Sequence, residues 1–322
     1  MWCILALPCH ADKKPQPLPT GTLSTVIRET ILFVSADPGS ERLATITPGR
    51  EMVIVERNGQ WLRVFANTDT EQSHAEDAPI FGQESAPPPV SGWTTGKGVI
   101  AADTPNGDEV LFGAAVNAEE LASEAHAPKR AAQDARLLYR RVTEMFPQSK
   151  FAGEAAWRSA DIRWQLEKED AFSRPSAHEK ENYLRQQLDE DEMKKIIKKY
   201  SGSKWADLAA YDMIDNKICG DWQGSEKCPE KESELYSKYA DDHPDSPRAA
   251  EALYKAAWRQ AAAADMYSAD NDEKKADQAR AQAKALAGRL QSKYPQTDYV
   301  PRAAALMYKL EQSIPIYGVD RD

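Results

Sequence analysis

Two short stretches of this chain combine residue types in the order that ligand-binding loops use. The first, GWTTGKG at residues 92–98, has the glycines and the lysine of a phosphate-binding loop. It is one residue short, however, and it lacks the Ser or Thr that would hold magnesium. The second begins at Asp270 with Asp-Asn-Asp, like a calcium loop, but Lys274 stands where another Asp or Asn should be. Neither stretch predicts a nucleotide or metal site.

The residue types that catalysis most often uses are scattered along the chain. The five histidines form no cluster, and the sequence contains neither the H-E-x-x-H zinc motif nor the G-x-S-x-G nucleophile motif. Carboxylates are abundant, but Lys or Arg stands four residues away on helical stretches, which is typical of solvated ion pairs. We therefore expect a protein that is not an enzyme, with no catalytic residues, no cofactor and no metal.

The overall charge narrows the classes of partner. With 41 Lys and Arg against 51 Asp and Glu, the net charge of the 322 residues is −10. An acidic surface repels nucleic-acid phosphates and anionic lipid headgroups, so we expect no nucleic-acid partner. No apolar run reaches the roughly 18 residues that a membrane span needs, so we also expect no transmembrane segment.

Cysteine usage and the N-terminus indicate an oxidising compartment. Cys219 and Cys228 flank a loop with two Gly and a Ser, and this spacing favours a disulfide over a zinc site or a C-x-x-C redox pair; two free thiols are the alternative. Residues 1–20 resemble the remnant of a secretory signal followed by a Pro-rich lead, with a short apolar tail as the alternative. We expect a periplasmic or secreted protein, and association with the outer membrane is left open.

Residues 21–103 have the texture of a small β-domain. Short β-branched or aromatic runs alternate with the turn signals DPGS, PG and NG, which predicts a small barrel or sandwich. The order ILFVSADPGSERLATITPGREMVIVERNGQWLRV followed by SGWTTGKGVI resembles a bacterial SH3 domain. The resemblance implies an SH3-like barrel. Residues 67–90 depart from that family's pattern, and we expect them to form a disordered, Pro-rich insertion. Trp61 and Trp93 are candidates for an aromatic binding groove, and packing inside the barrel is the alternative.

From Asp108 the spacing of apolar residues becomes helical, which predicts an all-α domain over residues 108–322. A pattern of twelve residues then recurs four times: FPQSKFAGEAAW, YSGSKWADLAAY, HPDSPRAAEALY and YPQTDYVPRAAA. A residue before proline avoids the helical region, and the second copy has Ser201-Gly202 in place of the proline. We therefore expect a helix to stop at the ring that opens each copy. We expect the hydroxyl residue three positions later to cap the next helix: Ser149, Ser203, Ser246 and Thr297. Four copies predict stacked helical hairpins.

The repeat is similar to those of bacterial periplasmic tetratricopeptide proteins, closest to outer-membrane-assembly lipoproteins and coordinators of envelope constriction. The multidomain fold expected is therefore an SH3-like barrel plus a tetratricopeptide-like helical array. The resemblance implies a periplasmic scaffold or adaptor that binds peptidoglycan peptides or envelope proteins. The runner-up is a targeting or regulatory subunit of a cell-wall hydrolase or an outer-membrane assembly machine. The first helix of each hairpin usually lines the concave face, where we expect these ligand-binding tyrosines: Tyr139, Tyr183, Tyr236 and Tyr254.

Overall fold

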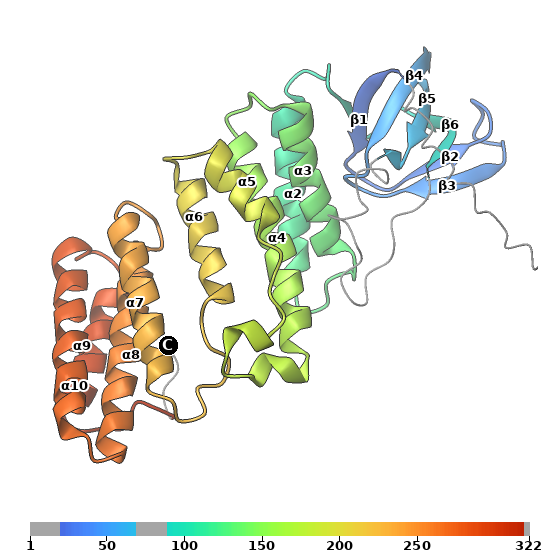
Figure 1. Ribbon diagram of the computed structural model, residues 1–322. Coiled ribbons are helices and arrows are strands. Elements are labelled where there is room, and N and C mark those ends of the chain that lie inside the picture. Colours follow the sequence, from blue (N-terminus) through green and yellow to red (C-terminus); the bar gives the residue numbers. More distant parts are fainter. Residues whose placement is uncertain (1–19, 69–88, 319–322) are drawn as a thin grey trace, which may run out of the picture. The chain divides into compact units, whose positions relative to one another are not determined.

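The computed structural model describes residues 20–68 and 89–318, and it begins with a β-domain (Figure 1). All strand pairs are antiparallel, in one sheet of order β3-β2-β6-β5-β4-β1-β7. The strands are β1 (Thr22–Val26), β2 (Thr30–Phe33), β3 (Arg42–Ile46), β4 (Met52–Asn58), β5 (Trp61–Ala66), β6 (Val90–Thr95) and β7 (Val99–Ala101).

The strands form where the sequence predicts them, and their apolar side chains fill the β-domain core. Val26, Leu32 and Val64 are fully buried there. The stretch SGWTTGKGVI contains two strands, because Gly98 takes a positive φ of 84° in the turn between β6 and β7. The GWTTGKG stretch thus covers most of β6 and the turn that leads to β7, which pairs with β1 and not with β6.

Within the described residues, nine α-helices follow the sheet (Figure 1). They are α2 (Gly107–Ala122), α3 (Ala131–Met145), α4 (Ala152–Phe172), α5 (Asp191–Lys199), α6 (Lys204–Asp212), α7 (Lys227–Asp242), α8 (Ala249–Ala269), α9 (Glu273–Lys293) and α10 (Tyr299–Glu311). Short 3₁₀ segments lie at η2 (Pro175–His178), η3 (Asn182–Leu184) and η4 (Met213–Asn216). The layout is therefore a β-domain followed by an all-α region.

The chain divides into two compact units, Met1–Ser149 and Lys150–Asp322. The first unit holds the sheet together with α2 and α3, although the periodicity of the sequence changes near residue 104. Contact between α3 and the turn before β4 is close: a Cβ added at Gly49 would lie 2.5 Å from Cβ of Leu137. Packing thus joins two helices to the β-domain, a relationship that local periodicity does not reveal.

The four repeated motifs form the same turn four times. The residues that open the copies, Phe146, Tyr200, His243 and Tyr294, end α3, α5, α7 and α9. Their φ angles lie between −113° and −131° and their ψ angles between 31° and 59°. In each copy the amide three residues later donates to the carbonyl of the opening residue. The predicted helix stops are confirmed.

The hydroxyl residues of the motif behave differently from one another, and the capping prediction holds only for Ser203. Its side chain accepts from the amide of Ala206 at 3.5 Å. Ser149 instead donates to Asp108 at 2.6 Å, and no side chain caps α4. Ser246 accepts from the Arg248 amide one residue before α8 begins, whereas Thr297 donates to the Tyr294 carbonyl. The prediction that this hydroxyl caps the next helix is therefore wrong for Ser149, Ser246 and Thr297. In these three copies the hydroxyl forms a hydrogen bond with a different donor or acceptor nearby.

The predicted insertion is shorter than expected at its N-terminal end. Asn67 and Thr68 are 1% and 2% exposed, and the Thr68 hydroxyl donates to Glu51 at 2.6 Å. Val90 already belongs to β6. The rest of the insertion, at residues 69–88, and the expected signal remnant at residues 1–19 lie outside the described residues.

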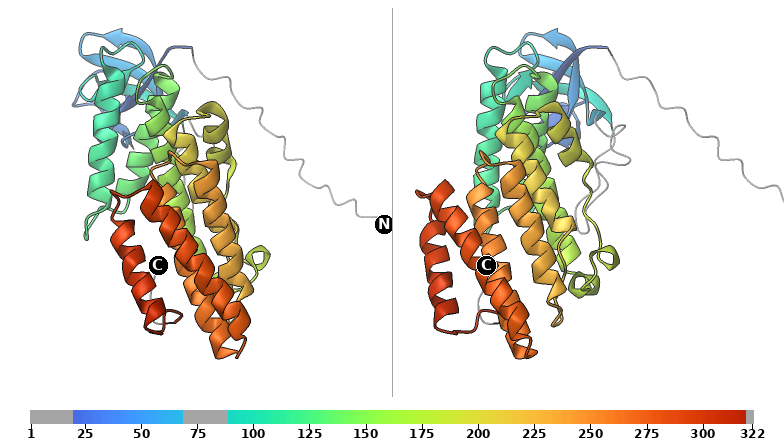
Figure 2. Two further views of the ribbon diagram at one scale, coloured as in Figure 1. Left: turned by 90° about the vertical axis from the view of Figure 1, so that its left-hand side faces the viewer. Right: turned by 60° about the vertical axis from the view of Figure 1, so that its left-hand side comes forward.

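In the second unit, α8 lies side by side with α7 and α9 (Figure 2). Alanines fill much of α8, and Ala256, Ala257 and Ala261 are fully buried. Small side chains let neighbouring helices approach closely, so α8 is the central helix of this core. No helix in residues 20–68 and 89–318 is long and apolar enough to cross a membrane.

Cys219 and Cys228 are paired before and at the start of α7, as predicted. Their Cα atoms are 5.9 Å apart and the sulfurs lie at disulfide distance. The loop is also held by Glu232, which accepts from the Cys219 amide at 3.1 Å and from the Trp222 indole at 2.9 Å. Glu232 is 2% exposed and receives a third hydrogen bond from Arg259 at 2.7 Å. A disulfide of this kind fits an oxidising, extracellular compartment.

Candidate functional site

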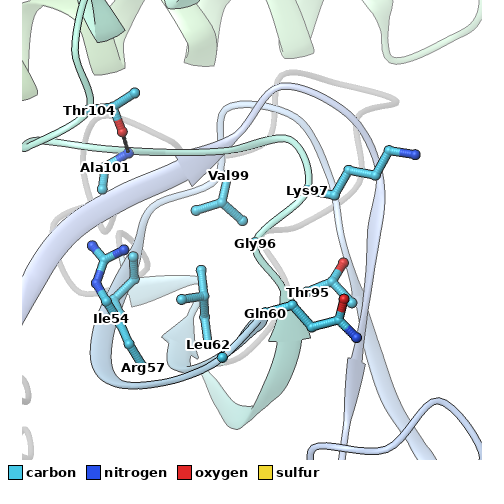
Figure 3. Close-up of a pocket in the computed structure, with 11 residues that line it drawn as sticks. Ile54, Arg57, Gln60, Leu62, Thr95, Gly96, Lys97, Val99, Ala101 and Thr104 are labelled. Atoms are coloured by element: carbon cyan, nitrogen blue, oxygen red, sulfur yellow. Dashed lines mark hydrogen bonds between the residues drawn. The ribbon is translucent and has the colours of Figure 1, made fainter.

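The β-domain contains a pocket of about 300 Å³ between the turn of the β4–β5 hairpin and the turn that joins β6 to β7 (Figure 3). The turn of β4 and β5 contributes Gly59 and Gln60, and the turn of β6 and β7 contributes Gly96 and Lys97. The Gly96 amide donates to the Gln60 carbonyl at 2.9 Å, which fixes the two turns beside each other. Apolar side chains line the interior of the pocket: Ile54, Leu62, Val99 and Ala101.

The rim of this pocket carries positive charge. Arg57 and Lys97 lie on opposite sides of it (Figure 3). Arg57 forms an ion pair with Asp103 at 3.4 Å, but both side chains are more than half exposed, so the pair is weak. Lys97 forms no ion pair with a described residue. Apolar walls beneath two cations suit a small ligand with an apolar body and a carboxylate.

Trp61 and Trp93 lie on neighbouring strands of the same sheet but outside the pocket lining. Trp61 is only 9% exposed and packs edge to face against Phe33, with ring centroids 5.8 Å apart. Trp93 is half-buried in β6 and pairs with Phe33 across the sheet. Packing therefore accounts for Trp61, and neither indole is part of the pocket.

The four tyrosines expected on a concave face do not share a surface. Tyr139 belongs to the first unit, is fully buried and donates to Glu119 at 2.6 Å. Tyr236 is 3% exposed within the core of the second unit. Tyr254 is half-buried beside Tyr299, and Tyr183 in η3 is 73% exposed. A surface ligand cannot contact Tyr139 or Tyr236, because neighbouring helices already cover them.

A larger hollow of about 540 Å³ lies in the second unit between α7 and α9, above α8. These two helices are the first members of the last two hairpins, so this interhelical groove lies where neighbouring repeats meet. Ser233, Gln260 and Leu286 line it and are nearly buried. Charged side chains from α7 and α9 form its rim: Glu234, Lys238, Asp241, Asp242 and Arg289.

Gln260 is the polar residue that sequence reasoning missed. It is 5% exposed, lines the interhelical groove, and its side chain makes no hydrogen bond to a described residue. Buried amides are normally paired, so an unpaired one that faces an opening points to a ligand or water. The sequence did contain one signal of this burial, because Gln260 directly precedes a run of four alanines. In the structure all four alanines are fully buried.

A cluster of carboxylates in the second unit includes Asp212, whose pKa lies near neutrality and could suggest catalysis. Burial, together with the carboxylates of Asp161 and Asp215, raises the pKa of Asp212 to about 7. Such a pKa can serve acid–base chemistry. Here, however, Asp212 accepts from the Trp157 indole at 3.1 Å, and Trp164 donates to Asp215 at 3.2 Å. These contacts give the carboxylates a structural role in joining α4 to α6 and η4.

A scan against protein-family models and a search of curated proteins found no match to this chain. The assignment of function therefore depends on the two hollows and on the repeated turns. Within residues 20–68 and 89–318, no group of three or more His, Cys, Asp or Glu is arranged to hold a metal ion.

Proposed function

We propose that this protein is a non-enzymatic adaptor of the bacterial cell envelope, working in the periplasm. The observation that carries the proposal is the fourfold repetition of one helix-to-helix turn, with an open groove where the last two hairpins meet. Arrays of helical hairpins use such grooves to hold segments of other proteins. In this role the helical region binds a protein partner and the β-domain binds a second ligand.

For the β-domain, we propose an SH3-like module that binds peptidoglycan peptides. The hairpin turn at Asn58 and Gly59 before Trp61, and the Gly92–Trp93 pair in β6, support this resemblance. Peptidoglycan peptides are short and carry free carboxylates. A pocket with apolar walls and two cations on its rim, Arg57 and Lys97, is chemically matched to that class of ligand.

The compartment is part of the proposal. The Cys219–Cys228 pair fits an oxidising environment, and the periplasm provides one. The negative net charge disfavours binding to nucleic acid and to anionic lipid, which leaves proteins and wall peptides as the expected partners.

Sedimentation of the full chain with purified peptidoglycan sacculi tests the proposal. We expect the protein to pellet with sacculi, and the Arg57→Ala, Lys97→Ala double variant to bind at least about fivefold more weakly, since two charge contacts are lost. Arg42→Ala is the matched control, because Arg42 is an exposed cation on β3 outside the pocket. Failure of the wild-type protein to pellet, or equal binding by the double variant, would count against the wall-peptide role.

A further inference from the structure

A largely buried glutamine lies at the base of the groove between α7, α8 and α9. Gln260 is 95% buried, lines the groove and makes no side-chain hydrogen bond to the described residues. Its neighbour Ser233 is 2% exposed and already donates to the Ala256 carbonyl at 2.9 Å. The Gln260 amide atoms are open to the groove, so a ligand that enters the groove can pair with them.

We propose that this groove binds an extended, basic peptide segment, and that the Gln260 amide pairs with one of its backbone peptide groups. The inference rests on the proposed adaptor function, because it names the partner chemistry of the helical array. A glutamine amide offers two N–H donors and a carbonyl acceptor. It can therefore accept from a peptide N–H and donate to a peptide C=O at once.

The size and lining of the groove suit a short stretch of main chain. Its volume of about 540 Å³ is within the range of sites that enclose a few residues. Leu286, 8% exposed on α9, provides an apolar wall beside the amide. An extended segment would place its backbone against Gln260 and a small apolar side chain against Leu286.

The charged residues on the rim of the groove favour a peptide segment that carries positive charge. Lys238 pairs with Asp242 at 2.9 Å, and Arg289 pairs with Asp241 and also donates to Ser237 at 3.1 Å. Both rim cations are therefore partly neutralised. Glu234 is exposed on α7 and forms no ion pair with a described residue. The remaining negative charge, on a chain of net charge −10, favours a segment with a Lys or Arg near Glu234.

Side-chain amide NMR on the full chain tests this directly. The Gln260 resonance is assigned by its loss in Gln260→Leu. The probes are two end-blocked peptides, Ala-Val-Lys-Val-Ala and Ala-Val-Glu-Val-Ala. We expect the lysine peptide to shift the Gln260 amide in a saturable titration, and the glutamate peptide to bind about threefold or more weakly. Absence of a Gln260 shift with either peptide would overturn the proposal, and the titration itself uses only the wild-type protein.

Three variants then separate the parts of the interaction. Gln260→Leu should bind the lysine peptide about fivefold more weakly, the effect of losing a neutral hydrogen bond. Glu234→Lys should remove the preference for lysine over glutamate. Gln278→Leu, on the exposed surface of α9 outside the groove, should bind as the wild type does. Equal binding by Gln260→Leu and the wild type would show that the buried amide has no ligand role.

This outcome can be told apart from failure of the adaptor proposal. The groove variants leave Arg57 and Lys97 intact, so their retention on sacculi should equal that of the wild-type protein. If sacculi are bound but the peptides are not, the groove inference fails while the wall-binding role stands. If the peptides are bound but sacculi are not, the β-domain assignment fails while the groove inference stands.

Discussion

Nη1 of Arg141 lies 3.0 Å from Oε2 of Glu51, a residue 90 positions earlier in the chain. The Arg141 side chain is fully buried, and its Nε also donates to the Gly49 carbonyl at 3.0 Å. One side chain of α3 thereby holds both the turn before β4 and the carboxylate that follows it. This contact explains why the β-domain and the first two helices form one compact unit.

Replacing Arg141 by methionine should destabilise the first unit by about 3–5 kcal/mol, because Glu51 would remain buried without its counter-charge. Urea unfolding monitored by tryptophan fluorescence measures the loss. Arg63→Met is the control, since Arg63 pairs with Glu56 at 3.7 Å with both side chains about half exposed, and we expect it to change stability by less than about 1 kcal/mol. Equal midpoints for the two variants would contradict this assignment of Arg141.

The fragment that should fold alone begins at Lys150, where the second compact unit starts. Periodicity by itself favours a fragment from Asp108, which would be strongly helical. That longer fragment would expose α3 residues that normally face the β-domain, among them Leu137 and the Arg141 side chain. We expect residues 150–322 to melt cooperatively by circular dichroism, and residues 108–322 to bind a hydrophobic dye. A dye-free fragment from Asp108 would show that α2 and α3 do not need the sheet.

Reduction of the Cys219–Cys228 disulfide should lower the stability of the second unit by roughly 2.5–3 kcal/mol, the loop-entropy value for about ten residues. Thermal unfolding with and without reductant measures the change. The Cys219→Ala, Cys228→Ala double variant is the control, because reductant should not alter its melting temperature. Two freely alkylated thiols in protein isolated without reductant would contradict the oxidised pair.

Tyr139→Ala and Tyr236→Ala should each destabilise by about 3–5 kcal/mol, as large truncations in a core do. This reverses the expectation from sequence that the two changes would weaken partner binding and leave the fold intact. Tyr183→Ala is the matched control, because Tyr183 is 73% exposed, and it should unfold at the wild-type temperature. Wild-type melting of the Tyr139 and Tyr236 variants would place these rings outside the core.

Burial of Asp212 predicts a stability that declines from acid towards neutral pH. Its folded-state pKa of about 7 exceeds the ordinary value of 3.8, so the folded chain keeps a proton that the unfolded chain releases. The stabilisation is complete below pH ~4 and is lost as the pH rises to ~7. Asp212→Asn keeps an acceptor for the Trp157 indole and removes the titration.

Urea midpoints at pH 4, 5.5 and 7 should therefore vary less in Asp212→Asn than in the wild-type protein. The exposed Asp245→Asn is the control and should retain the wild-type profile. Asp134, whose pKa burial raises to about 6, contributes in the same direction in the first unit. An unchanged profile in Asp212→Asn would show that this carboxyl is ionised in the folded protein.

The sequence alone determined those features that depend on neighbouring residues. The strands on either side of Asn58–Gly59, the helix stop at Phe146 and the pairing of Cys219 with Cys228 all follow from backbone sterics or short loops. In each case the groups that matter lie within about ten positions, so chain packing elsewhere leaves them unchanged.

Tertiary structure decided which side chains a ligand can reach. Tyr139 and Tyr183 are the same residue type near repeated turns, yet one is fully buried and the other is 73% exposed. Ser149 loses its expected cap role because Asp108, from another helix, lies within hydrogen-bonding distance. Gln260 is a candidate ligand-binding residue because a groove lies between α7 and α9 at its position on α8. Burial and pairing depend on elements far apart in the chain, and local propensity contains no information about how those elements pack.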